Sequence, residues 1–267
     1  MDVVRVRASS WAELFDCPMR WRARHLDGVR SPSGVRAQIG TAIHAGAAAF
    51  DQATLDGYPI SIADASDVLV NTLDYPQEEV VWTADDPSKT QARAIALRLL
   101  SRYCELIAPT KRYIAVERRC DNLTIDVGNG IGIELTGTTD RIRETHQGPA
   151  ISDLKSGLRR ATVNGDVVSV RTDGPQLGVY ELLAEQTTGL PITGPAEIIG
   201  MQTRANGGIG FQTVPRTREI LIGTQESPGL LQMAGTMFKE GLFPPNPSST
   251  LCSEKYCPVF GHCRYHN

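Results

Sequence analysis

The sequence predicts an α/β fold with a mixed central sheet, from about residue 113 to 214, flanked by helices. Apolar residues recur at helical spacing in segments 35–55 and 90–107. From residue 113 the pattern changes to segments rich in β-branched residues, separated by Gly and Asn turns. A further helical segment, about 173–188, separates these from two more strand-like segments. Hydrophobic content of 41% and charged content of 21% are typical of a globular protein.

The N-terminal part is expected to be helical. Ser10 followed three residues later by Glu13 is a capping-box pattern that predicts a helix start. Cys17-Pro18 interrupts this helix, because proline lacks an N–H and disfavours helix before it. His44 lies in the second helix among small residues, which would let that helix lie close against a sheet. A single helical histidine is more often a core or surface residue than a ligand.

Charge is distributed unevenly along the chain. Residues 37–88 contain nine acids and no Lys or Arg, and residues 51–88 are expected to form a loose helical insert. The rest of the chain has 27 basic and 21 acidic residues, so its net charge is +6, although that of the whole chain is −3. Most of the bases are Arg, which suits bidentate phosphate contacts. This permits a nucleic-acid partner without requiring one, and Arg20 and Arg24 are candidate phosphate contacts.

The strongest candidate for chemistry is a predicted hairpin. Strands are expected over 113–120, 123–127, 131–143 and 149–155. Because side chains alternate along a strand, Asp153 and Lys155 share one face, with Asp140 on the neighbouring strand. Two carboxylates can hold a hard divalent cation, and an ammonium can stabilise an attacking hydroxide or a developing phosphorane charge. On this stretch alone, ordinary solvated strand residues explain the pattern equally well.

The remaining elements lie in the C-terminal half. Gln176 and Tyr180 are four apart on the helix opened by Asp173-Gly174-Pro175, so they share one face. Segments 196–203 and 209–214 predict a hairpin, followed by a last helix over about 217–240. There is no Walker-type loop and no Rossmann fingerprint, so ATP-driven chemistry is not expected. No apolar run approaches the roughly 20 residues of a membrane span, and no secretory signal is apparent, so a cytoplasmic protein is expected.

Three cysteines close together in the tail, Cys252, Cys257 and Cys263, indicate a metal site. With His266 as fourth ligand they would form a zinc knuckle. With Cys17 they would form a four-thiolate site, which suits an iron–sulfur cluster and would tie the two termini together. Spacing alone slightly favours zinc. The two remaining cysteines, Cys104 and Cys120, are expected to be buried core thiols.

The order of these motifs resembles that of RecB-like exonucleases of the PD-(D/E)XK nuclease superfamily. The specific likeness is to the iron–sulfur branch that includes AddB nuclease domains, CRISPR-associated adaptation nucleases and phage exonucleases. No single motif is specific, but their order and spacing together are. The motifs that carry the resemblance are Ser9-Ser10-Trp11, Cys17-Pro18, Trp21, Gly40-Thr41-Ala42-Ile43-His44, Glu117, Gly137-Thr138-Thr139-Asp140-Arg141, Asp153-Leu154-Lys155, Gln176-x-x-x-Tyr180 and the tail cysteines.

The resemblance implies a restriction-endonuclease-like core and a set of site residues. His44, Asp140, Asp153 and the Leu154 carbonyl would bind Mg²⁺ or Mn²⁺, and a histidine ligand somewhat favours Mn²⁺. Lys155 would orient or activate the attacking water. Gln176 and Tyr180 would position the DNA and the site, and Glu117 is a weaker match to an upstream acid.

The resemblance also implies a structural [4Fe–4S] cluster held by Cys17, Cys252, Cys257 and Cys263. Four residues separate Cys252 from Cys257, where the family commonly has two, and this departure keeps zinc open as the alternative.

The resulting expectation is a single nuclease domain over residues 1–267. It would comprise a helical part (1–110), a catalytic sheet core (111–216) and a cysteine-rich C-terminal segment (217–267). It would hydrolyse DNA as a metal-dependent exonuclease, at single-stranded ends, alone, as an oligomer or with recombination or replication proteins. A non-catalytic DNA-binding or adaptor module on the same fold and a zinc-stabilised nuclease are the alternatives.

Overall fold

The computed structural model describes the backbone of residues 1–168 and 170–266 and, within that part, all side chains except those of residues 170–172. The helices are α1 (Trp11–Asp16), α2 (Pro18–His25), α3 (Val35–Leu55), α4 (Ile62–Asp74), α5 (Lys89–Arg102), α6 (Val170–Thr188), α7 (Thr217–Ile222) and α8 (Leu230–Glu240). The strands are β1 (Asp2–Arg7), β2 (Ser33–Gly34), β3 (Val80–Val81), β4 (Tyr113–Arg119), β5 (Leu123–Asp126), β6 (Ile131–Thr136), β7 (Thr138–Arg143), β8 (Ala150–Gly157), β9 (Ala196–Gln202) and β10 (Ile209–Val214).

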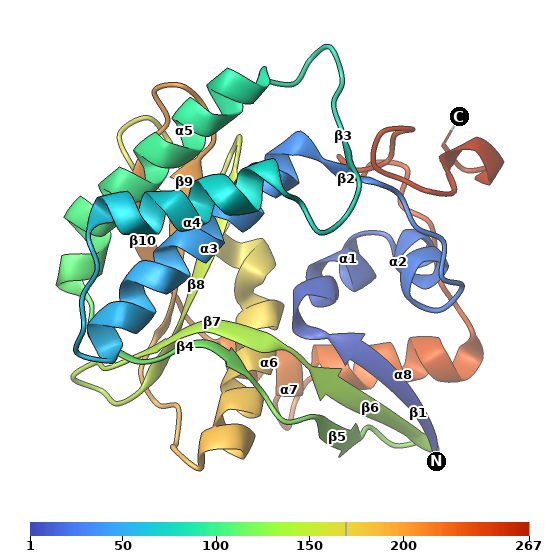
Figure 1. Ribbon diagram of the computed structural model, residues 1–267. Coiled ribbons are helices and arrows are strands. Elements are labelled where there is room, and N and C mark those ends of the chain that lie inside the picture. Colours follow the sequence, from blue (N-terminus) through green and yellow to red (C-terminus); the bar gives the residue numbers. More distant parts are fainter. Residues whose placement is uncertain (169, 267) are drawn as a thin grey trace.

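The central sheet has five strands in the order β10-β9-β8-β7-β4. Strands β8 and β9 are parallel, while the other neighbours are antiparallel, so the sheet is mixed as predicted. The predicted hairpins β7–β8 and β9–β10 are both present. Figure 1 shows helix α3 in front of this sheet and α6 behind it.

Two apolar cores lie on the two faces of the central sheet. On one face, Leu154 and Ile199 pack with residues of α3, α4 and α5. On the other, Ile151 and Ile198 pack with α6, α1 and the small sheet. Because side chains alternate along a strand, neighbouring residues of β8 enter opposite cores. This alternation sets which residues of β8 can point toward α6 and which toward α3.

The strand predicted over residues 131–143 is in fact two strands in different sheets. Strand β6 lies in a three-stranded sheet between β1 and β5, while β7 belongs to the central sheet, and Gly137 separates them. A Cβ atom at Gly137 would lie 3.0 Å from the Tyr180 ring and 3.2 Å from Ala8 Cβ. The strand therefore changes sheet at a glycine whose position is closely packed on the side of a Cβ atom. The pairing of β1 with β6 joins residues far apart in the chain, and the sequence pattern did not predict it.

Two predicted helix boundaries and one predicted cap are wrong, although α1 does begin directly after Ser10 as predicted. Ser10 does not cap α1 with its side chain, because its hydroxyl donates to the Arg7 carbonyl and accepts from Trp21 Nε1. Helix α6 begins at Val170 rather than Asp173 and contains Pro175. The last helix is split into α7 and α8 at Gly223, which has a φ of +85°, a conformation that favours glycine. By contrast, the break at Cys17-Pro18 is confirmed, since α1 and α2 are separate helices.

The two ends of the chain meet. Asn246 Nδ2 donates to the Asp16 carbonyl at 2.9 Å, and Ser249 Oγ donates to the Asp16 carboxylate at 2.5 Å. Figure 1 shows the C-terminal segment running beside α1 and α2. In the described part of the chain, no helix is both long enough and apolar enough to cross a membrane.

Candidate functional site

Three acidic residues, Glu117, Asp140 and Asp153, lie on the neighbouring strands β4, β7 and β8 of the central sheet. The register pairs Val116 with Arg141 and Arg118 with Thr139, which places Glu117 of β4 opposite Asp140 of β7. The β7–β8 ladder ends at the pair Arg141–Ser152, so the next residues, Asp140 and Asp153, lie where the two strands separate. There the Leu154 N–H donates to Asp140 Oδ2 at 2.9 Å. At this opening between β7 and β8, the carboxylates of Asp140 and Asp153 therefore face the two sides of the sheet.

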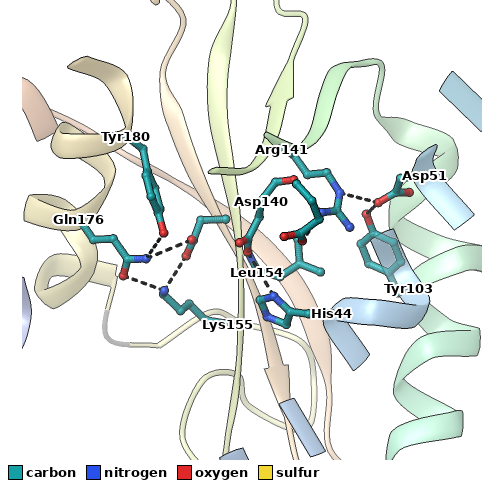
Figure 2. Close-up of polar contacts among 11 residues, drawn as sticks. His44, Asp51, Tyr103, Asp140, Arg141, Leu154, Lys155, Gln176 and Tyr180 are labelled. Carbon is teal, nitrogen blue, oxygen red and sulfur yellow. Dashed lines mark hydrogen bonds and ion pairs between the residues drawn. The ribbon is translucent and has the colours of Figure 1, made fainter. Parts of the chain in front are cut away.

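A group of three donors could hold a metal ion. One ligand atom each from His44, Glu117 and Asp140 lies within 4.8 Å of the other two. His44 comes from α3, and its Nδ1 is 3.4 Å from Asp140 Oδ2. Figure 2 shows its ring pointing at Asp140, beside Leu154. An imidazole and two carboxylates are suitable ligands for Mg²⁺ or Mn²⁺. Compared with the predicted ligands, this group of described residues contains Glu117 in addition and lacks Asp153.

Asp153 instead belongs to a buried polar cluster with Lys155, Gln176 and Tyr180. Lys155 Nζ is 2.8 Å from Asp153 Oδ2 and donates to Gln176 Oε1, also at 2.8 Å. The Gln176 amide donates to the Tyr180 hydroxyl at 3.0 Å and more weakly to Asp153 Oδ1 at 3.4 Å. Figure 2 shows Gln176 and Tyr180 reaching from α6 toward Lys155. The structure thus brings the predicted Gln176 and Tyr180 pair against the predicted Asp153 and Lys155 pair.

Glu117 is held by residues that the sequence analysis did not single out. Arg141 Nη1 contacts Glu117 Oε1 at 3.2 Å, and its Nε donates to Asp51 Oδ2 at 2.7 Å. Tyr103 also donates to Asp51, at 2.6 Å. The Glu117 backbone has a φ of +45°, an unusual value that costs free energy and needs such support. Asp51 lies seven positions, or two helical turns, after His44 on α3. This spacing, which places both residues on one face of the helix, is the sequence feature that could have pointed to Asp51.

The shared site shifts the pKa values of its members. Burial and repulsion by Asp140 raise the pKa of Glu117, although Arg141 opposes the shift. Burial raises the pKa of Asp153, against the effect of Lys155. Burial alone would lower the pKa of Lys155, but the charges of Asp153 and Asp140 outweigh it and raise that pKa. Lys155 is therefore a cation at neutral pH. A metal ion would relieve the crowding of carboxylates that raises the pKa values of Glu117 and Asp153.

The four cysteines of the predicted cluster line one cavity. Cys17 lies between α1 and α2, and Cys252, Cys257 and Cys263 come from the tail. All four are free thiols. His266, the alternative fourth ligand, packs its ring against Phe260 with centroids 4.0 Å apart. The other two cysteines, Cys104 and Cys120, are buried as predicted, with exposures of 3% and 5%.

Arg20 and Arg24, the predicted phosphate contacts, both lie in an ion-pair network with Glu13. Arg20 is 4% exposed and donates to Glu13 Oε1 at 2.9 Å, so its guanidinium is not available on the surface. Arg24 donates to the other oxygen of Glu13, also at 2.9 Å, and its side chain is 37% exposed. The cluster is chiefly an ion-pair network that joins α1 to α2.

Comparison with known proteins agrees with this geometry. The family model of the PD-(D/E)XK nuclease superfamily matches residues 6–264. The chain belongs to this superfamily. The match includes every candidate metal ligand and Lys155, and nucleases of this superfamily generally use divalent metals and act on DNA. The three-donor group of His44, Glu117 and Asp140 could hold such a metal.

A solved structure shares the fold. The crystal structure named as a "putative exonuclease" from Eubacterium rectale is similar, with a TM-score of 0.53 and 13% sequence identity. The alignment covers 97% of this chain and 87% of that one. No curated protein sequence matches the chain at a significant level.

Proposed function

We propose that this chain is a divalent-metal-dependent DNA exonuclease that acts at single-stranded ends. The observation that carries the proposal is the meeting of the His44, Glu117 and Asp140 donors with the Asp153–Lys155 pair at the opening between β7 and β8. Exonucleolytic action and single-stranded ends follow from the resemblance to RecB-like exonucleases. The name of the Eubacterium rectale structure, which includes the word exonuclease, also supports exonucleolytic action.

The proposed roles follow from the contacts. His44, Glu117 and Asp140, with Asp153 and the Leu154 carbonyl as further candidates, would hold a divalent cation, which would supply positive charge for the scissile phosphate and make water more acidic. Because Lys155 stays protonated, it acts as a cation that orients the attacking water and stabilises charge developing on the phosphate. Asp153 and Gln176 hold its ammonium from two sides at 2.8 Å. Tyr180 in turn holds the Gln176 amide.

Hydrolysis of end-labelled DNA tests the proposal. Single- and double-stranded substrates are digested with Mg²⁺, with Mn²⁺ and with EDTA. We expect products released stepwise from one end, only with metal, and a loss of rate of about 10²-fold or more in Lys155→Ala and Asp140→Asn, since each removes charge from the reacting centre. The exposed Lys239→Ala is the matched control and keeps the wild-type rate. Folded protein that binds DNA without hydrolysing it would indicate the adaptor module instead.

We further propose a structural [4Fe–4S] cluster at the four cysteines. Supporting it, Cys17 and the three tail cysteines line the same cavity, whereas His266 packs against Phe260. A tetrahedral zinc site with Zn–S bonds of about 2.3 Å would hold its sulfurs within about 4 Å of one another. Over the described part of the chain, no three cysteine sulfurs lie within 4.8 Å of one another. Cysteine sulfurs that lie farther apart than those of a single zinc site suit a cluster of several metal atoms.

A further inference from the structure

A second pocket lies beyond the carboxyl ends of the parallel strands β8 and β9. It has a volume of about 680 Å³ and is walled by the start of α3, by α5 and by the segments that follow the two strands. Thr203 N donates to the Gly157 carbonyl at 3.1 Å, so the two strands end side by side. Pockets of this size hold small ligands or parts of larger ones, and the carboxyl ends of parallel strands are a usual place for them.

Helix α3 connects this pocket to the candidate metal centre. His44, Gly40 and Arg36 follow one another at intervals of four residues, so they lie along one face of the helix. Gly40 lies directly against Ser156 of β8, since a Cβ atom at position 40 would meet the Ser156 Oγ. Arg36 lies two turns before His44, about 12 Å along the helix axis at 1.5 Å per residue. The candidate metal centre and the pocket therefore lie next to each other along the contact between α3 and β8.

Three arginines line the pocket, namely Arg36, Arg98 and Arg204. Arg98 is used structurally, because it donates to the Gly207 and Arg204 carbonyls, each at 2.9 Å. These bonds hold the turn that presents Arg204, which is exposed. Arg36 makes one long hydrogen bond, from Nη1 to the Thr203 carbonyl at 3.4 Å. Arg36 and Arg204 thus retain donors that can face a ligand.

An unpartnered polar group indicates that the pocket is built for a ligand. Thr203 lines it and is 0% exposed, yet its Oγ1 has no hydrogen-bond partner among the described residues. A buried hydroxyl without a partner costs free energy, and a phosphate oxygen would satisfy it. The pocket also contains Asp85 and Asp86. Asp86 is bonded to Thr83 and lies 3.7 Å from Lys255, which offsets its charge, and Asp85 is exposed.

We propose that this pocket, here called the Arg36 pocket, holds a phosphate of the substrate strand away from the bond being cleaved. Arg36, Arg204 and Thr203 would bind the phosphate, and the apolar surface of Leu158 and Ile95 would pack against the nucleoside. Because the two places are about two turns of α3 apart, a strand longer than a dinucleotide is needed to occupy both of them. This assignment rests on the proposed function, since it takes the bound polymer to be the DNA that the metal centre cleaves.

The first test is binding without catalysis. Anisotropy of a labelled 12-nucleotide single strand is measured in EDTA with the full chain, at several salt concentrations. We expect Arg36→Ala and Arg204→Ala each to weaken binding about 10-fold and to reduce the salt slope by about 0.7, the value for one lost phosphate contact on a single strand. Arg36→Lys should recover most of the affinity because it keeps the charge. Arg112→Ala, an arginine with an 87% exposed side chain beyond the other end of α5, should show neither change.

The second test is length dependence of cleavage. With metal present, Arg36→Ala should lower kcat/KM on the 12-nucleotide strand about 10-fold through KM, while cleavage of a dinucleotide, too short to span both places, changes less than about twofold. Equal losses on both lengths, or 12-nucleotide binding no weaker than in Arg112→Ala, would overturn the proposal. Competition by deoxyadenosine monophosphate as strong as by the 12-nucleotide strand would also overturn it, since the pocket would then hold free product.

The two proposals fail in distinguishable ways. DNA hydrolysis by the wild type with no effect of Arg36→Ala or Arg204→Ala would remove the Arg36 pocket and leave the nuclease. Binding that depends on both arginines without any hydrolysis would retain the Arg36 pocket as a DNA contact and remove the nuclease.

Discussion

At the scale of single residues, the most constrained side chain is Glu117. It has left-handed backbone geometry, with a φ of +45°, and offers a carboxylate to the candidate metal. Arg141 reaches it from β7 and is itself anchored by Asp51, and both of these side chains are buried. In this arrangement the position of a metal donor depends on an ion pair between α3 and β7.

Asp51→Asn tests this dependence. Removing the charge leaves the buried Arg141 guanidinium without its anion, so we expect a loss of about 3 kcal/mol of stability to urea. Because Glu117 is then held less firmly, the Mn²⁺ concentration for half-maximal activity should rise several-fold. Tyr103→Phe removes only the hydroxyl bonded to Asp51 and serves as the control, with a loss of about 1 kcal/mol. An unchanged metal requirement in Asp51→Asn would show that the network stabilises the fold alone.

At the scale of elements, Glu13 joins α1 to α2. It accepts from Arg20 and Arg24, and His25 Nε2 lies 3.5 Å away. Burial would raise the pKa of Glu13, but the nearby His25 and the charges of the two arginines outweigh burial and lower the pKa to about 2. This contact ties Arg20 and Arg24 of α2 to Glu13 of α1.

The depressed pKa of Glu13 predicts a pH dependence of stability. A carboxyl group whose folded pKa lies below its unfolded value of 4.5 contributes stability above pH 4.5 and loses it as the pH falls toward 2. The contribution is at most about 3 kcal/mol, from roughly 1.4 kcal/mol per pH unit. We therefore expect Glu13→Gln to be less stable than the wild type in urea at pH 7, with the difference shrinking between pH 4.5 and 2. The exposed Glu226→Gln is the control; a difference that stayed constant with pH would refute the assignment.

At the scale of the whole molecule, the two termini close on one another. Trp21 of α2 packs against Phe238 and Phe243, with ring centroids 5.5 and 6.4 Å apart. The hydrogen bonds to Asp16 and the shared cavity of the four cysteines lie beside this contact. A metal cluster there would join residues more than 200 positions apart and restrict the unfolded chain.

Cys17→Ser tests the proposed clamp. Closing so long a loop is worth on the order of 5 kcal/mol by the logarithmic loop rule, so we expect a clear loss of thermal stability together with loss of bound iron and sulfide. Anaerobic purification of the wild type should give a brown protein, and Cys104→Ser, outside the cavity, should keep its colour. A colourless wild type that contains zinc would contradict the cluster.

The order of elements in the catalytic core could be predicted from the sequence. Alternation along β8 placed Asp153 and Lys155 on one face, and turn residues between β7 and β8 predicted the hairpin, which the structure confirms. These predictions succeeded because strand alternation and turn formation depend on residues within a few positions of one another.

Only the tertiary structure decided which of these side chains meet. Arg141 and Asp51 are 90 positions apart, and Arg36 meets Thr203 across 167 positions. It also decided that β6 and β7 belong to different sheets, with Gly137 between them. No local pattern encodes such contacts, because they depend on how α3 packs on β8 and where the strands of the sheet separate. The sequence therefore determined the identity and local placement of the candidate catalytic residues. Packing between distant elements decided that Glu117 lies with the metal donors, that Gln176 meets Lys155, and that arginines line a second pocket.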